Sequence, residues 1–388
     1  MLIQDTESLA KFCDALKGAP YLAVDTEFMR ESTYRAELCL VQVAYGEHAA
    51  AIDPLAKGID LAPLHALLAE PGTLKVLHSA GQDLEIFLHA TGSVPGPVFD
   101  TQIAASVCGL GDQPGYAKLA AELLGVQLDK ASQAVDWSIR PMSERQVDYA
   151  LGDVTHLCRI YEMLVADLEA KGRGAWVAQE MEALMEPSRY RVDPRLAYRR
   201  LKIRRPSTRD LAVLRELAGW REEAAVARNI PRGWVVRDDA LVEIAQHLPS
   251  NAEQLTRVRG LKPHVAKGAD GRAILGAIQL ALGTPEDEWP DAPAARVRLS
   301  GHEPLVALLQ ALLRLRCDAH GVSTSMIANR SDLDQIATEE EPDVPALKGW
   351  RRTIFGDDAL QLRAGRLTLT GDGEFGVRSC TPGSSRDE

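Results

Sequence analysis

The sequence predicts an N-terminal α/β domain, with helices flanking a mixed sheet, followed by an almost wholly helical half. Three observations predict this division. Apolar runs of strand length alternate with helical patterns from residue 1 to about residue 170. After Pro206 the apolar spacing is helical almost throughout. Four prolines between residues 284 and 304 then mark a linker between two similar helical segments.

The predicted strands of the α/β domain are short apolar runs. The first three follow one another through short links, which favours an antiparallel meander over a start with a crossover helix. Helical spacing between and after these runs predicts five helices. Ser143 with Gln146 three residues later resembles a capping box that starts the last helix. The strands are expected over 22–28, 38–45, 48–52 and 74–77, and the helices near 61–69, 84–90, 101–108, 118–124 and 143–168.

Composition beyond the α/β domain predicts five further segments. The segment that precedes Pro206 is rich in arginine, and the last eighteen residues are rich in glycine, serine and charge, a composition typical of disorder. We therefore expect an α/β domain over 1–170, a basic linker over 171–206, a helical domain over 207–284, a linker over 285–302, a diverged second copy over 303–370 and a disordered tail over 371–388.

The overall charge and cysteine content narrow the class of protein. The chain of 388 residues has a net charge of −11, which is unusual for a protein that binds phosphate backbones. Nine Lys or Arg residues against one acid between residues 189 and 209 offset it locally; this stretch either guides a phosphate backbone or is a solvated segment that pairs with the acidic body.

The sequence predicts a cytoplasmic protein, expected to be monomeric. It has six cysteines without a CxxC pair, no signal peptide and no apolar run of membrane-spanning length.

Four carboxylates and a tyrosine are the candidate catalytic residues. Asp25 and Glu27 are two apart on a predicted strand, so both project from one face. Tyr149 and Asp153 are four apart on a predicted helix, so they lie one turn above each other. Asp83 falls early in another predicted helix. One strand and two helices can therefore present four carboxylates to a single point.

Such a cluster requires a counter-charge. Two anions about 4 Å apart repel by roughly 4 kcal/mol at an effective dielectric constant near 20. Either protons or cations must offset this repulsion. A set of oxygen ligands without His or Cys favours Mg²⁺ or Mn²⁺ over zinc. Two such ions can activate a water and stabilise the leaving oxygen of a phosphoryl displacement, so the sequence predicts a phosphodiesterase site with two divalent cations.

Three segments resemble the motifs of the DEDD superfamily of 3′–5′ exonucleases, in its tyrosine-bearing subgroup, and more closely those of the ribonuclease D family. The resemblance covers nearly the whole chain and implies a ribonuclease H-like fold for the α/β domain. The helical half resembles tandem HRDC domains, of which the second is diverged. The segments with ribonuclease D-like wording are Asp25-Thr26-Glu27-Phe28, Leu38-Cys39-Leu40-Val41-Gln42 and Asp136-Trp137-Ser138-Ile139-Arg140-Pro141-Met142-Ser143.

The resemblance also implies residue roles. Asp25, Glu27 and Asp153 would be metal ligands, with Asp25 bridging both ions, and Asp83 would hold the second ion directly or through water. Tyr149 would orient the attacking water and help to deprotonate it. Because an unperturbed tyrosine pKa is near 10 and a metal-bound water is already acidic, the orienting role is favoured over that of a strong general base. Every catalytic position of the family pattern is filled in this sequence.

Substrate contacts are expected at less distinctive positions. Phe28 either stacks on the terminal base or belongs to the core. Gln42 either contacts the terminal sugar or satisfies a buried backbone group. Cationic side chains could neutralise phosphates or lie on solvated faces; they are Lys130, Arg140, Arg199, Arg200, Arg204 and Arg205.

The acidic cluster together with the resemblance to ribonuclease D implies a metal-dependent 3′–5′ exoribonuclease that releases 5′-monophosphates, with RNA that has a free 3′ end, above all tRNA precursors, as its substrate. A DNA 3′–5′ exonuclease of the proofreading or helicase-associated type is the alternative, because the catalytic motifs do not read the sugar. A non-catalytic RNA-binding protein is the third hypothesis, and the complete set of five catalytic residues opposes it.

Overall fold

The N-terminal domain is built on a six-stranded mixed sheet with the strand order β1-β4-β3-β2-β5-β6. The computed structural model describes residues 1–128, 135–292, 301–374 and 376–381. The predicted meander is confirmed, since β2, β3 and β4 pair antiparallel, while β5 and β6 continue the sheet in parallel with β2. The strands are β1 (Leu2–Ile3), β2 (Tyr21–Met29), β3 (Glu37–Tyr45), β4 (His48–Ile52), β5 (Leu74–Leu77) and β6 (Val98–Asp100).

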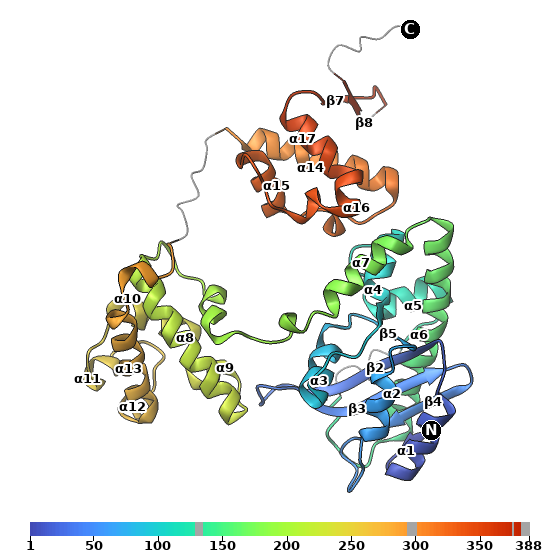
Figure 1. Cartoon of the computed structure of the whole chain (residues 1–388), viewed down its shortest axis with the longest axis horizontal. Coiled ribbons are helices and arrows are strands. Elements are labelled where there is room, and N and C mark those ends of the chain that lie inside the picture. The colour runs from blue at the N-terminus through green and yellow to red at the C-terminus, as the bar shows by residue number, and fades with distance from the viewer. Residues whose placement is uncertain (129–134, 293–300, 375, 382–388) are drawn as a thin grey trace.

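Helices cover both faces of this sheet (Figure 1). The five predicted helices are confirmed, and α1 was not predicted. The longest, α6, begins at the predicted capping box of Ser143 and Gln146 and packs across β2, β3 and β4. Its buried side is apolar except for Asp153. The helices are α1 (Thr6–Ala15), α2 (Ala62–Ala69), α3 (Gly81–Thr91), α4 (Thr101–Cys108), α5 (Tyr116–Leu124) and α6 (Glu144–Ala170).

The segment expected to be a basic linker over 171–206 is folded in the structure. It contains α7 (Gly174–Leu184) and the 3₁₀ helices η2 (Pro187–Arg189) and η3 (Pro194–Arg200). The apolar side of α7 packs on α4 and β6, and η3 packs along α8. The sequence analysis missed the helices of this segment, because their apolar residues are few and widely spaced among the basic ones.

Residues 208–288 form a helical domain with its own hydrophobic core. The second helical domain, by contrast, shares one continuous core with the N-terminal domain. The helices of the first domain are α8 (Thr208–Arg228), α9 (Arg232–Val235), α10 (Asp238–His247), α11 (Ala252–Leu255), α12 (Pro263–Lys267), α13 (Ala269–Gly283) and η4 (Glu286–Glu288). Those of the second are α14 (Glu303–His320), η5 (Thr324–Met326), α15 (Arg330–Thr338), η6 (Pro345–Leu347), α16 (Gly349–Arg351), the π-helical turn η7 (Arg352–Gly356) and α17 (Asp357–Arg363).

The start of the expected disordered tail is ordered. β7 (Thr368–Gly371) pairs antiparallel with β8 (Val377–Cys380), so the prediction of disorder from residue 371 is wrong over this hairpin. Its alternating threonine, leucine and valine provide strand propensity that the glycine and charge content masked. Residues 382–388 lie outside the described part of the chain.

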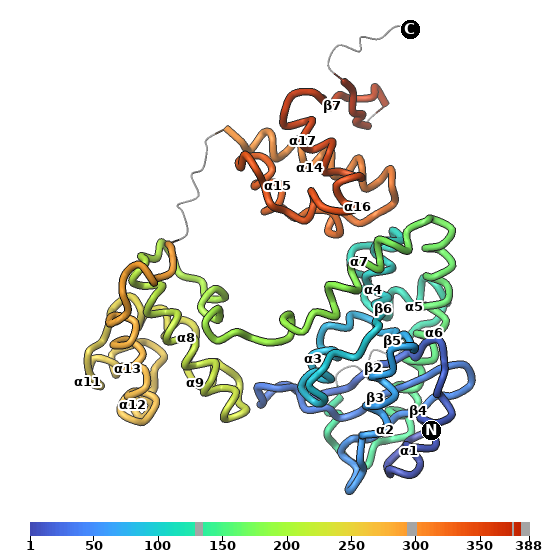
Figure 2. Tube along the Cα trace, in the orientation of Figure 1, coloured from blue at the N-terminus to red at the C-terminus, as the bar shows by residue number. Residues whose placement is uncertain are grey.

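The second helical domain lies beside α7 in Figure 2, and side-chain contacts join the two. The rings of Trp176 and Trp350 stack with centroids 4.7 Å apart. Arg351 donates to Glu180 at 2.6 Å, and Arg173 donates to the carbonyl of Gly321 at 3.1 Å. In the described residues, no helix combines the length and the apolar character that a membrane crossing needs. All six cysteines are free thiols.

Candidate active site

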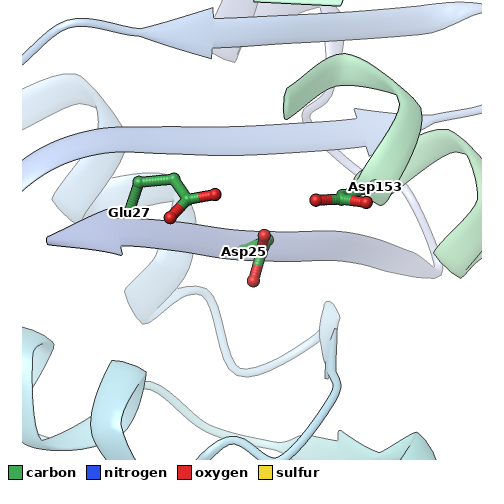
Figure 3. Close-up of side chains that lie close together, drawn as sticks. All are labelled: Asp25, Glu27 and Asp153. Atoms are coloured by element: carbon green, nitrogen blue, oxygen red, sulfur yellow. The ribbon is translucent and has the colours of Figure 1, made fainter. Parts of the chain in front are cut away.

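Three predicted acids meet at one point of the N-terminal domain. Asp25 and Glu27 project from one face of β2, and Asp153 approaches them from α6 (Figure 3). Each offers a carboxylate oxygen that lies within 4.8 Å of the oxygens of the other two. A spacing of this size lets the three side chains share cations, so the predicted convergence is confirmed for these three acids.

Strand register explains how the acids reach this face. In the pairing of β2 with β3, Asp25 lies opposite Gln42 and Glu27 lies opposite Leu40. Opposed residues of antiparallel strands project to the same side, and Leu40 packs with Ala150 of α6. The register then shifts between Glu27 and Phe28. A bulge of this kind bends the strand and redirects the side chains beside it.

Asp83 lies near the cluster but outside the group of three. It is buried in the first turn of α3 and accepts a hydrogen bond from the hydroxyl of Thr26, whose side chain points to the opposite face of β2 from Asp25. Thr26 is therefore a positioning residue that the sequence analysis missed, although it stands between the two acids. The role of Asp83 as a metal ligand stays a prediction.

Burial raises the pKa values of all four acids, and repulsion from neighbouring acids adds to this effect for Glu27, Asp83 and Asp153. Burial raises the pKa of Asp25 to about 6. Burial and the charge of Asp25 raise the pKa of Asp153 to about 7 and that of Asp83 to about 8, the latter against the hydrogen bond from Thr26. Burial and its three acidic neighbours raise the pKa of Glu27 to about 9. Without a cation the pocket therefore retains protons near neutral pH.

The donor set of this pocket fits a hard divalent cation. Its ligand atoms are carboxylate oxygens, which Mg²⁺ and Mn²⁺ prefer. Oδ1 of Asp153 is buried and has no hydrogen-bond partner in the described residues. A buried acceptor without a partner costs free energy unless a proton or a cation satisfies it. The raised pKa values of the four acids and the unpartnered Oδ1 of Asp153 therefore both favour a cation at this site.

Two tyrosines line the α6 side of the site. Burial, followed by the charges of Asp153 and Glu27, raises the pKa of Tyr149 well above its usual range. Tyr149 therefore keeps its proton and can donate a hydrogen bond, which agrees with an orienting role and disfavours a general base. Tyr116 on α5 donates to the backbone carbonyl of Asp153. The sequence analysis missed this support for α6, because Tyr116 is 37 residues away along the chain.

Gln42 lies under α6 with its side chain fully buried. Both amide atoms lack a hydrogen-bond partner in the described residues. The expected alternative, in which Gln42 satisfies a buried backbone group, is not what the structure shows. A direct contact with a terminal sugar would also need an opening to Gln42, because its side chain is 0% exposed.

Arg140 is a structural residue in this fold. Its Nε and Nη2 atoms donate to the two carboxylate oxygens of Asp53 at 2.9 and 2.7 Å, and Nη2 also donates to the carbonyl of Cys39. Nη1 donates to the carbonyl of Trp137 at 2.6 Å. These bonds use the guanidinium group internally and oppose a contact with substrate phosphates, which stays a prediction.

The remaining predicted contacts are dispersed. Phe28 is half-buried at the bulge that follows Glu27. Arg200 lines a cleft beside the N-terminal domain, whereas Arg199 lines a separate pocket around Tyr198. Arg204 and Arg205 are exposed just before α8. Lys130 lies outside the described residues. The predicted roles of these residues in binding the substrate stay predictions.

Comparisons with known proteins agree with this geometry. Residues 1–169 match the 3′–5′ exonuclease family, and residues 210–278 match the HRDC domain. The chain therefore carries the catalytic domain of a 3′–5′ exonuclease together with an HRDC domain. The predicted second HRDC domain over 303–370 stays a prediction.

Relatives over nearly the full length define the family. Ribonuclease D of Acidiphilium cryptum is 47% identical over 373 residues, which cover 96% of this chain and 95% of that protein. Ribonuclease D of Granulibacter bethesdensis is 48% identical over 376 residues, with 96% and 95% covered. The crystal structure of Escherichia coli RNase D, an exoribonuclease involved in structured RNA processing, is similar with a TM-score of 0.81 and 32% identity, covering 93% of this chain and 98% of that chain. The chain belongs to the ribonuclease D family, which confirms the predicted fold class and the predicted 3′–5′ exoribonuclease activity.

Proposed function

We propose that this exoribonuclease uses two divalent cations, Mg²⁺ or Mn²⁺, held by Asp25, Glu27, Asp83 and Asp153, and releases 5′-monophosphates from RNA 3′ ends. The observation that carries the proposal is the approach of three carboxylate oxygens within 4.8 Å of one another in a pocket that raises their pKa values. When bound, two such ions activate the attacking water and stabilise the leaving oxygen.

Each side chain has a distinct part in this proposal. Asp25 is the central ligand, because its charge raises the pKa values of Glu27, Asp83 and Asp153. Asp83, fixed by Thr26, serves the second ion from the α3 side. Tyr149 remains protonated and orients the nucleophile by hydrogen bonding.

The substrate proposed is RNA with a free 3′ end, and tRNA precursors in particular. The support is the family: Escherichia coli RNase D, which is 32% identical, is an exoribonuclease involved in structured RNA processing. We further propose that the protein acts in the cytoplasm as a monomer. DNA is the competing substrate, because carboxylates that bind cations do not distinguish a ribose from a deoxyribose.

The decisive experiment compares 5′-end-labelled RNA and DNA of matched sequence in Mg²⁺, in Mn²⁺ and in EDTA. We expect stepwise shortening of the RNA from its 3′ end, nucleoside 5′-monophosphate products and no reaction in EDTA. Preferential degradation of the DNA would reject the substrate, and 3′-monophosphate products or full activity in EDTA would reject the chemistry.

A matched pair of variants separates the site from general charge effects. Asp153→Asn removes one buried carboxylate of the cluster, whereas Asp148→Asn removes an exposed carboxylate just over one turn earlier on the same helix. We expect Asp153→Asn to abolish cleavage and Asp148→Asn to leave it unchanged. Equal activity of the two variants would contradict the assignment of Asp153.

A further inference from the structure

A large cleft lies between the N-terminal domain and the HRDC domain. Its volume is about 1250 Å³. Segments that are far apart in the sequence form its walls: the β2–β3 loop, α3, the connector around η2 and η3, and the end of α8 with α9. In Figure 1 the β2–β3 loop extends from the sheet toward α9 on this side of the molecule. The fold therefore creates a surface that no single stretch of sequence displays.

One wall of the cleft continues the elements of the active site. Arg30 stands three residues after Glu27 at the end of β2, and Glu85 stands two residues after Asp83 on α3. Arg30 donates to both carboxylate oxygens of Glu85 at 2.9 Å, so the two elements are tied together at the cleft. The cleft therefore lies beside the ends of two elements that carry acids of the candidate site.

The charges that line the cleft divide into paired and unpaired groups. Four of its six carboxylates, those of Glu85, Glu222, Asp238 and Asp239, each pair with an arginine. Four lining arginines have no carboxylate partner in the described residues, and all four are exposed; they are Arg35, Arg189, Arg191 and Arg200. Unpaired guanidinium groups that surround a hollow are suited to successive phosphates.

The β2–β3 loop contacts the HRDC domain at the cleft. Tyr34, at the tip of the β2–β3 loop, packs against the core of the HRDC domain and hydrogen bonds to the carboxylate of Glu222, which is 1% exposed. Beside it, the backbone N–H of Arg35 donates to the side chain of Asn229 at 3.1 Å. These bonds hold the backbone of Arg35 at the cleft, which the arginines of the connector also line.

We propose that this cleft binds the phosphodiester backbone of single-stranded RNA upstream of the 3′ end, through Arg35, Arg189, Arg191 and Arg200. The inference rests on the proposed function for the direction of the strand. It differs from the sequence prediction, because the structure adds Arg35 from the β2–β3 loop and leaves Arg199, Arg204 and Arg205 outside the cleft. Tyr34 and Tyr190 also line the cleft and offer aromatic surface near unstacked bases.

The test compares two double variants that remove the same charge from the same segment. Arg191→Gln/Arg200→Gln changes the cleft, and Arg199→Gln/Arg204→Gln changes neighbouring arginines that do not line it. Binding of a fluorescent single-stranded RNA is measured by anisotropy in EDTA over a range of salt concentrations. Each lost phosphate contact should reduce the slope of log K against log salt by about 0.7, hence by about 1.4 for the cleft variant.

Between about 50 and about 200 mM salt, the wild-type affinity should therefore fall about sevenfold more than that of the cleft variant. The control variant should keep the wild-type slope, and the cleft variant should show a raised KM for RNA in Mg²⁺ with an unchanged kcat. Equal slopes for the wild type and the cleft variant, or equal losses in both variants, would overturn the proposal. If the wild type cleaves no RNA in Mg²⁺, the proposed function is wrong. The binding measurement in EDTA still tests whether the cleft binds RNA.

Discussion

Replacing Asp153 by Asn should stabilise the metal-free protein at alkaline pH. The pKa of Asp153 rises from 3.8 to about 7 on folding, and one pKa unit corresponds to about 1.4 kcal/mol. A fully ionised Asp153 therefore costs the folded state roughly 4 kcal/mol near pH 8. Because the pKa of Asp153 is raised in the folded state, its contribution to the free energy of unfolding is most favourable below about pH 4. This contribution declines as the pH rises through about 7. The neutral amide that Asp153→Asn introduces has no such dependence, so the variant should gain most near pH 8 and least near pH 4.

The assay is hydrogen exchange of peptides from β2 and α6 in EDTA, because these two elements carry the cluster. Asp148→Asn serves as the control for a lost surface charge. Added Mg²⁺ at about 100 times its Kd should protect the wild type by about 2.7 kcal/mol and leave Asp153→Asn almost unchanged. Equal protection of the wild type and Asp153→Asn in EDTA near pH 8, or equal protection of both by Mg²⁺, would refute the reasoning.

Three further substitutions test individual side chains. Tyr149→Phe should lower kcat by about a hundredfold or more while Mg²⁺ still protects β2 and α6 from exchange; a rate near that of the wild type would remove the orienting role. Arg140→Gln should cost about 3–5 kcal/mol in urea unfolding, because it leaves Asp53 buried without its cationic partner, and a loss below about 1 kcal/mol would contradict the structural role. Gln42→Met should raise stability in EDTA by about 1–3 kcal/mol, since it removes a buried amide without partners; destabilisation would mean that the amide is satisfied.

The sequence predicted most elements whose pattern is local, although it missed α1. The four long strands and five helices of the N-terminal domain have apolar periodicity over several residues, and the capping box at Ser143 is complete within four positions. β1 and β6 contain two and three residues, too few to show a period. Lys75 interrupts the apolar run of β5, yet it is fully buried, because three backbone carbonyls accept hydrogen bonds from its ammonium group.

In the candidate site, too, the local features were predictable from the sequence and the long-range contacts were not. Asp25 with Glu27, and Tyr149 with Asp153, were predictable because strand and helix geometry fixes each pair locally. The partners of Asp83 and Arg140 were not, because Thr26 and Asp53 lie 57 and 87 residues away from them along the chain. Sequence spacing predicts the side of a strand or helix from which a side chain projects. The contact partners of that side chain are known only from the fold.

The net charge of −11 is compatible with RNA binding because the relevant charge is local. With a Debye length of about 8 Å at physiological ionic strength, distant surface acids contribute little at the cleft. There, four arginines lack carboxylate partners in the described residues, while most lining acids are paired. Cations at the active site would cancel the densest cluster of negative charge. RNA would therefore meet positive charge along its path, and the acidic remainder of the surface would disfavour binding elsewhere.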